Sequence, residues 1–186
     1  MRLFLKNMVS LRCKMVVKTE LENLGIYNAT IGIGDIKLNE TISDGKYNLL
    51  KNHLRNAGFE ILNDRKSILV EKIKNVIIEM IHFTSEPPDV KYSIFISEKL
   101  NYDYTYLSNI FSEVKGITIE HFIIFNKIER VKELLIYNEL TLSEIARKLQ
   151  YCNVSHLSGQ FKKTTGLSPR EFKSLKQHVR VGLEET

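Results

Sequence analysis

Residues 96–122 read ISEKLNYDYTYLSNIFSEVKGITIEHF, and residues 145–172 read IARKLQYCNVSHLSGQFKKTTGLSPREF. When one extra residue is allowed in the second stretch, nine aligned positions are identical. They are Ile96/Ile145, Lys99/Lys148, Leu100/Leu149, Tyr102/Tyr151, Leu107/Leu157, Ser108/Ser158, Phe111/Phe161, Gly116/Gly166 and Phe122/Phe172. A segment that recurs within one chain usually folds as a repeated supersecondary unit. The repeat therefore predicts two copies of one helical motif, named here the first motif (residues 96–122) and the second motif (residues 145–172).

Each motif is predicted to contain two helices joined by a short turn. Asp103 and Asn153 follow the Leu-x-Tyr triplets, and both are residue types that cap helix N-termini. Gly116 and Gly166 come after the second helix and can take the left-handed conformation that ends it. The two motifs are therefore predicted to be helix-turn-helix units, joined by a long helix.

The second helix of each motif has the dimensions needed to fit into the major groove of DNA. A helix of about 10–12 Å diameter fits the major groove of B-DNA, where its outward side chains meet base edges. The repeated Leu and Phe positions belong to the core, so the polar residues between them face outward. The predicted base-facing residues are Tyr104, Thr105, Ser108, Asn109 and Ser112 in the first motif, and Ser155, His156, Ser158, Gly159 and Lys162 in the second. If the joining helix holds the motifs parallel, they would enter successive major grooves, roughly 34 Å apart.

Charge is unevenly divided between the two motifs. Residues 141–180 contain eight basic and two acidic side chains, whereas residues 90–140 contain six basic and seven acidic ones. Neutralisation of DNA phosphates is therefore expected mainly from the second motif. We predict that Thr105, Ser108 and Asn109 read bases. The predicted phosphate-binding residues are Lys162, Lys163, Arg170, Lys173 and Lys176.

In these features residues 66–178 resemble the seven-helix DNA-binding domain of the AraC/XylS family of bacterial transcription regulators. The resemblance rests on I-A-x-x-L-x-Y at residues 145–151, on L-S-x-x-F-K-K-x-x-G-x-S-P-x-x-F-K at residues 157–173, and on KIERVKELL at residues 127–135. Gly159 departs from the pattern, because many members have a long polar or basic residue there. The resemblance implies double-stranded DNA as the partner. It also implies that residues 1–62 sense an unidentified effector or form a homodimer.

Residues 1–62 are predicted to form a separate α+β domain. Strand signals at residues 2–6 and 59–62 flank two helical segments, at residues 11–24 and after Ser43. Between these helices, Ile31, Ile33, Ile36 and Leu38 alternate around Gly34-Asp35, which predicts a hairpin. The order is β-α-β-β-α-β, that of ferredoxin-like folds. The predicted fold is thus a ferredoxin-like domain (residues 1–62), followed by an all-α double helix-turn-helix domain (residues 66–178) and a short tail (residues 179–186).

The same element order also resembles heavy-metal-associated domains, whose first loop carries M-x-C-x-x-C. This chain has Met8, Ser10 and Cys13 at the corresponding positions, so one thiolate ligand is replaced by a hydroxyl, a poor ligand for copper(I). One interpretation is that Ser10 caps the first helix and Cys13 is a packing residue. The other is that two protomers share a metal ion through a pair of Cys13 thiolates.

Composition limits the remaining classes of function. The chain has 186 residues, 27 basic against 22 acidic, with 43% hydrophobic and 26% charged residues, as in ordinary soluble proteins. No apolar run approaches the length of a membrane span, and charges near the N-terminus are untypical of a signal peptide. Two distant cysteines predict a reducing cytoplasm rather than a disulfide scaffold. Motifs for catalysis, a cofactor or a nucleotide are absent, so we expect neither an enzyme nor a cofactor.

The combined patterns predict a cytoplasmic transcription regulator that binds promoter DNA through two helix-turn-helix motifs. Two alternatives stay open at this point. The chain could be a metal-binding or metal-transfer protein with a helical appendage. It could also be a protein-interaction module whose DNA surface has decayed, as the acidic first motif and Gly159 allow.

Overall fold

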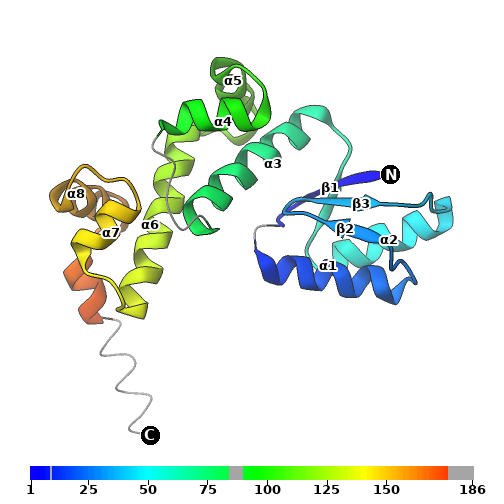
Figure 1. Cartoon of the computed structure of the whole chain (residues 1–186), viewed down its shortest axis with the longest axis horizontal. Helices are drawn as coiled ribbons and strands as arrows, with labels where there is room; N and C mark the ends of the chain where they lie inside the picture. Colours follow the sequence, from blue (N-terminus) through cyan, green and yellow to red (C-terminus); the bar gives the residue numbers. More distant parts are fainter. Residues whose placement is uncertain (9, 84–89, 176–186) are drawn as a thin grey trace, which may run out of the picture. The chain divides into compact units, whose positions relative to one another are not determined.

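The computed structural model describes residues 1–8, 10–83 and 90–175 (Figure 1). The chain divides into two compact units. The first contains Met1–Ile77 and Tyr92–Gly116, and the second contains Ile78–Lys91 and Ile117–Thr186, as far as these stretches are described. Residues 96–116 of the first motif therefore fall in the first unit, whereas residues 117–122 and the whole second motif fall in the second. The predicted tail (residues 179–186) lies outside the described residues.

The N-terminal part forms a four-stranded antiparallel sheet. Its strands are β1 (Arg2–Lys6), β2 (Ala29–Ile31), β3 (Asp35–Leu38) and β4 (Glu60–Leu62), in the spatial order β2-β3-β1-β4. In register, β1 places Leu3 opposite Ile36 and Leu5 opposite Ile61. Together with the two helices between the strands, this is the predicted β-α-β-β-α-β order.

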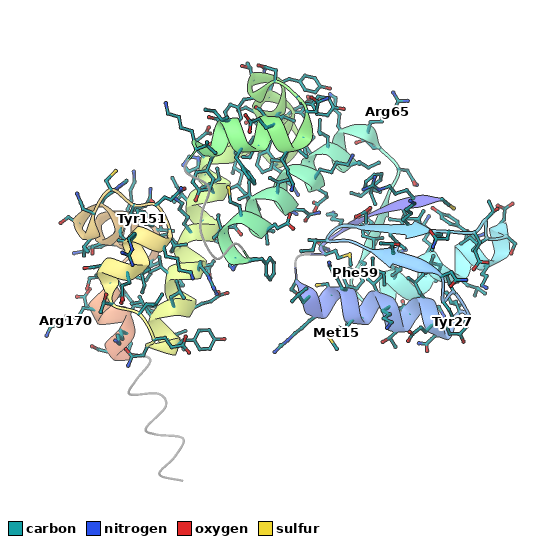
Figure 2. All side chains as sticks on the ribbon, in the orientation of Figure 1. Met15, Tyr27, Phe59, Arg65, Tyr151 and Arg170 are labelled. Atoms are coloured by element: carbon teal, nitrogen blue, oxygen red, sulfur yellow. The ribbon has the colours of Figure 1, made fainter. Side chains whose placement is uncertain are left out.

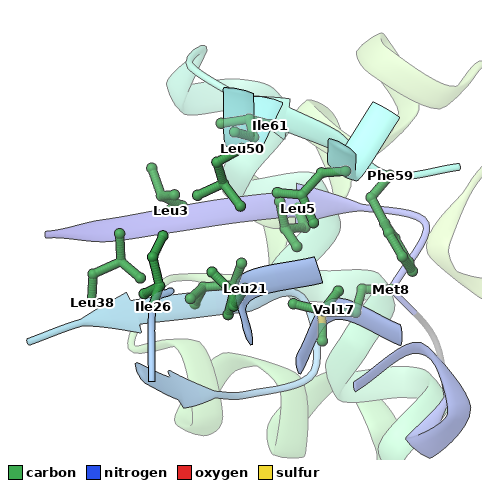
Figure 3. Packing of buried hydrophobic residues seen from close by; sticks show 12 residues of the cluster. Leu3, Leu5, Met8, Val17, Leu21, Ile26, Leu38, Leu50, Phe59 and Ile61 are labelled. Carbon is green, nitrogen blue, oxygen red and sulfur yellow. The ribbon is translucent and has the colours of Figure 1, made fainter. Parts of the chain in front are cut away.

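Every second side chain of the strands points toward two helices and packs beneath them. Helix α1 (Leu11–Asn23) is capped by Ser10 and helix α2 (Asp44–Asn56) by Ser43, because each serine hydroxyl accepts a bond from a backbone N–H three residues ahead. The core between helices and sheet includes Leu5, Val17 and Leu50, all fully buried, and Figure 3 shows this cluster from close by. Burial of each such side chain contributes about 1.5–3 kcal/mol.

The hairpin between β2 and β3 turns slightly earlier than its sequence indicates. Ile31 is the last residue of β2 and Asp35 is the first of β3, so Ile33 and Gly34 lie in the turn. Gly34 has φ +86°, and a Cβ atom there would lie 1.9 Å from the side-chain nitrogen of Asn75. Asn75 also donates a hydrogen bond to the Ile33 carbonyl at 3.2 Å. The positive φ therefore requires a glycine here, and the Asn75 side chain packs directly against it.

The remaining described residues are almost entirely helical, as predicted from Lys66 onward. Helix α3 (Arg65–Ile78) continues into a π-helix, η1 (Glu79–Phe83), and Pro87-Pro88 lie outside the described residues. The later helices are α4 (Tyr92–Leu100), α5 (Tyr104–Lys115), α6 (Ile119–Tyr137), α7 (Leu142–Lys148) and α8 (Val154–Thr165), followed by a helical stretch over residues 169–175. The first motif is thus built around α4–α5, the second around α7–α8, and α6 is the joining helix.

Candidate nucleic-acid interface

The second helices of the two motifs have the same length and the same kinds of caps. Helices α5 and α8 each contain 12 residues. The Asp103 carboxylate accepts bonds from the N–H groups of Thr105 (2.8 Å) and Tyr106 (3.2 Å), and the Asn153 side chain accepts from the His156 N–H at 2.8 Å. Both helices end at a left-handed glycine, Gly116 or Gly166. The caps predicted from the repeat are confirmed.

The turns within the motifs also share one backbone conformation. Asn101 has φ +57° and Gln150 has φ +54°, at equivalent places in the repeat. Left-handed backbone costs roughly 1–2 kcal/mol for a residue other than glycine. That the second motif adopts it with a glutamine indicates that packing on both sides imposes the turn.

The core sides of α5 and α8 determine which residues face outward. Leu107 and Phe111 of α5 are fully buried, and so are Leu157 and Phe161 of α8. The Phe161 ring also packs edge-on against Phe172, with 5.6 Å between ring centroids. Because these pairs are spaced i, i+4, they fix the rotation of each helix about its axis. The opposite side of each helix is left exposed.

Most of the predicted base-facing residues lie on these outer sides. In α5, Thr105 and Asn109 are exposed, whereas Tyr104, Ser108 and Ser112 are half-buried. In α8 the exposed residues are Ser155, His156, Gly159 and Lys162, and Ser158 is half-buried. A Cβ atom added at Gly159 would meet nothing within 4 Å, so the middle of this face is open.

The cations predicted to bind phosphate gather around α8 and the helical stretch after it. Lys162, Lys163 and Arg170 are exposed, and Figure 2 shows Arg170 pointing away from the ribbon. Lys173 is half-buried and donates a hydrogen bond to the side chain of Asn138, which is the C-cap residue of α6. Lys176 lies outside the described residues.

The cationic groups at α5, in contrast, are paired with carboxylates. Lys115 Nζ lies 3.6 Å from Glu71, a carboxylate on α3 that is only 4% exposed and that also bonds Lys74 at 2.8 Å. Burial lowers the pKa of Lys115. Lys66 of α3 bonds Glu113 at 2.6 Å. Little positive charge is therefore left for a phosphate at this helix.

Sequence reasoning overlooked two aromatic residues in the first motif. Tyr102, in the turn, is 48% exposed and Tyr106, the third residue of α5, is 49% exposed. Their rings stack with centroids 5.6 Å apart and an interplanar angle of 20°. The repeat contained the signal, because Tyr106 aligns with His156, which was predicted to face DNA.

In the second motif the equivalent aromatic pair is partly buried. Tyr151 is 7% exposed, and its ring packs edge-on against His156 at 5.4 Å. Lys127 of α6, which is 8% exposed, places its ammonium 5.0 Å from the Tyr151 ring. Burial raises the pKa of Tyr151 to about 12 and lowers the pKa of Lys127 to about 8. This pair joins α6 to the turn of the second motif.

The N-terminal segment considered for metal binding is tied into the domain. Met8 belongs to the buried core cluster and is 0% exposed. The Ser10 hydroxyl caps α1 and lies 3.2 Å from the Cys13 thiol. Over the residues that the structure describes, three or more potential metal ligands do not gather anywhere. Nor is any helix in the described ranges both long and apolar enough to cross a membrane.

Paired helix-turn-helix motifs with polar outer faces define a class of DNA-binding fold. Comparison with protein families agrees with this class: a family described as a helix-turn-helix domain matches residues 96–174. The C-terminal domain of AraT, a response regulator from Geobacillus stearothermophilus, superimposes with a TM-score of 0.51 and 30% identity, covering 60% of this chain and 88% of that domain. Residues 96–174 therefore form a helix-turn-helix domain of the AraC/XylS type.

Two further similarities concern sequence and fold. The uncharacterized HTH-type transcriptional regulator YtdP of Bacillus subtilis is 28% identical over 132 residues, which is 71% of this chain but only 17% of that protein. A DNA-binding transcriptional dual regulator of Escherichia coli K-12 shares the fold, with a TM-score of 0.51 at 15% identity over 63% of this chain and 99% of that one. The chain thus spans a small part of the length of its curated relative.

Proposed function

We propose that this chain is a sequence-specific transcription regulator that binds promoter DNA through α5 and α8. The observation that carries the proposal is the matched construction of the two motifs. Both have a left-handed turn, an N-cap, a 12-residue helix held by a buried Leu/Phe pair, and a polar outer side. The AraC/XylS-type domain at residues 96–174 and the resemblance to YtdP and to the C-terminal domain of AraT support it further.

The two helices have different tasks in the proposed complex. Thr105, Ser108 and Asn109 of α5 read base edges with neutral hydrogen-bonding groups. The second motif supplies most of the affinity, because Lys162, Lys163 and Arg170 neutralise phosphates and displace condensed counterions. Helix α6 has 19 residues and is therefore roughly 28 Å long. If this helix holds the motifs parallel, α5 and α8 would enter successive major grooves, roughly 34 Å apart.

In the proposed regulator, residues 1–62 form a ferredoxin-like domain and residues 66–178 the DNA-binding domain, in a cytoplasmic protein. The order of the elements and the strand order β2-β3-β1-β4 with antiparallel pairing support the ferredoxin-like assignment. Its role is to form a homodimer or to sense an effector. Sedimentation equilibrium of the full chain measures whether it dimerises.

Salt-dependent binding to DNA tests the proposal. Fluorescence anisotropy would follow the full chain on a random 40-bp duplex, and on a duplex selected from a random library, at several salt concentrations. Wild-type protein should bind both, more tightly to the selected duplex. Lys162→Ala should lower the slope of log K against log salt by about 0.9, the value for one phosphate. Lys51→Ala, which removes an exposed lysine of α2, is the matched control and should leave the slope unchanged.

Two results would contradict this assignment. Absence of salt-dependent binding to any duplex would indicate an interaction module without DNA affinity. An unchanged slope for Lys162→Ala would show that this lysine does not contact phosphate. The second result would leave DNA binding itself intact.

A further inference from the structure

The stacked pair Tyr102 and Tyr106 is the largest exposed aromatic feature of α5 and its turn. Both rings are about half exposed, and stacking restricts the rotamers of Tyr106. The base-reading roles proposed above assign no function to Tyr102 or Tyr106. Within the part of the chain that the structure describes, neither phenol hydroxyl makes a hydrogen bond, although the Tyr106 phenol is one of the groups that raise the pKa of the nearby Lys66.

Two cations beside α5 are already paired with carboxylates, and Lys99 at the end of α4 is the exposed cation nearest to the pair in sequence. Within α5 the only basic residue is Lys115, which is paired with the buried Glu71. Lys66 is held by Glu113, and this bond is the main cause of the raised pKa of Lys66. The N-terminus of the helix is occupied as well, because the Asp103 carboxylate accepts the N–H groups of Thr105 and Tyr106. A neutral donor on α5 is therefore a candidate partner for a DNA phosphate.

The second motif provides the contrast. There the residue equivalent to Tyr102 is Tyr151, which is buried against Lys127, and the residue equivalent to Tyr106 is His156. Exposed lysines on α8 can bind phosphate without an aromatic donor. Of the two motifs, the first has the exposed phenol pair and fewer exposed cations on its second helix.

We propose that Tyr106 donates its phenol hydrogen to a DNA phosphate, and that Tyr102 positions the Tyr106 ring by stacking on it. The inference rests on the proposed function, which it refines with a named backbone contact. Tyrosine hydroxyls are regular donors to phosphate oxygens in protein–DNA complexes. A neutral donor adds a hydrogen bond without neutralising charge, so this contact contributes affinity but not salt dependence.

Removing one oxygen atom tests the contact. Tyr106→Phe keeps the ring and its stacking but cannot donate. In anisotropy titrations with the full chain it should weaken binding by about tenfold or more, as expected for loss of one hydrogen bond to a charged phosphate. The loss should be the same factor on the random and the selected duplex, with the salt slope unchanged. Tyr27→Phe, on an exposed tyrosine of the N-terminal part, is the control and should bind as wild type does.

The positioning role of Tyr102 has its own pair of variants. Tyr102→Phe retains the stacked ring and should bind nearly as tightly as wild type, whereas Tyr102→Ala should lose a factor similar to that of Tyr106→Phe. If both Tyr102 variants lose affinity equally, the hydroxyl rather than the stack matters, and the positioning role is wrong. Circular dichroism of each variant checks that the helices remain folded.

Each other outcome has one meaning. If wild-type protein binds no duplex, the proposed function fails and not this contact alone. If wild-type protein binds and Tyr106→Phe binds equally well, the phosphate contact is refuted while DNA binding stands. A loss confined to duplexes with one particular base pair would show that Tyr106 reads a base, and a changed salt slope would also contradict a neutral contact.

Discussion

At the scale of single residues, Lys127 is an unusual member of the joining helix. It is nearly buried, yet it keeps its ammonium above the Tyr151 ring. Attraction between a cation and an aromatic face offsets part of the cost of removing the charge from water. Burial still dominates, because it lowers the pKa of Lys127 to about 8. The turn of the second motif therefore depends on a group that titrates close to neutral pH.

The lowered pKa predicts how stability changes with pH. Between pH 8 and about 10 the unfolded chain retains the Lys127 proton while the folded chain has lost it, so the unfolded state binds more protons and stability rises with pH. Relative to Lys127→Met, the wild-type free energy of unfolding should increase by about 2 kcal/mol over this interval. Urea titrations at several pH values measure the difference.

Comparison with the Met variant cancels the groups that both proteins share. Above about pH 10 the raised pKa of Tyr151 acts in the opposite direction, so the measurement stops there. A difference between the two proteins that stays constant from pH 7 to 10 would mean that Lys127 keeps its proton in the folded state.

At the scale of elements, two glycines associated with α8 have opposite effects on its stability. Gly159 lies within the helix in open space, and Gly166 ends it with φ +81°. Gly159→Ala should raise the free energy of unfolding by about 1 kcal/mol, because alanine favours helix. Gly166→Ala should lower it by about 1 kcal/mol, because a Cβ atom disfavours the left-handed conformation. Urea unfolding of both variants measures the signs.

These variants are controls for each other, since the atoms added are identical. Equal signs would contradict the conformations assigned to the two positions. Destabilisation by Gly159→Ala alone would show that α8 is packed against something at its outer side.

Local hydrogen bonds explain why many element ends could be predicted from sequence. Ser10, Ser43, Asp103 and Asn153 cap helices where predicted, because a cap needs only a side chain and an N–H group two or three residues away. The repeat likewise predicted both helix-turn-helix motifs. The β-α-β-β-α-β order along the chain also followed from alternation and turn residues.

Features that depend on distant residues were not predicted. The hairpin turns at Ile33 and Gly34, where Asn75 of α3 makes close contact. The π-helix at Glu79–Phe83 has the same apolar pattern as the α-helix before it. Tyr106 was missed because its exposure depends on how α5 packs, whereas the half-buried Tyr104 was selected. Contacts across the fold, rather than local propensity, decide these cases.

At the scale of the whole molecule, the uneven charge predicted from sequence corresponds to a real difference between the motifs. At α5, Lys115 and Lys66 are paired with carboxylates, whereas Lys162 and Lys163 on α8 are exposed. The proposed regulator therefore needs both motifs, one for attraction to DNA and one for choice of sequence. Binding should depend on their spacing along the duplex.

Spacing can be tested with the selected duplex. Its two preferred sequence blocks should be centred about one helical turn apart, which is 10–10.5 bp. An insertion of five base pairs between them places the blocks on opposite sides of the duplex. The two motifs can then no longer bind both blocks at once, so affinity should fall by about tenfold or more. Insertion outside the blocks is the control. If affinity is insensitive to both insertions, one motif alone binds DNA.

The open space around Gly159 has an evolutionary consequence. Its place on the outer side of α8 is exposed, and an added side chain would displace no neighbouring atom. If α8 enters the groove as proposed, mutation of this one codon would add a contact without sacrificing an existing one. Descendants of this protein could therefore acquire new operators in a single step, through a position that currently imposes no preference.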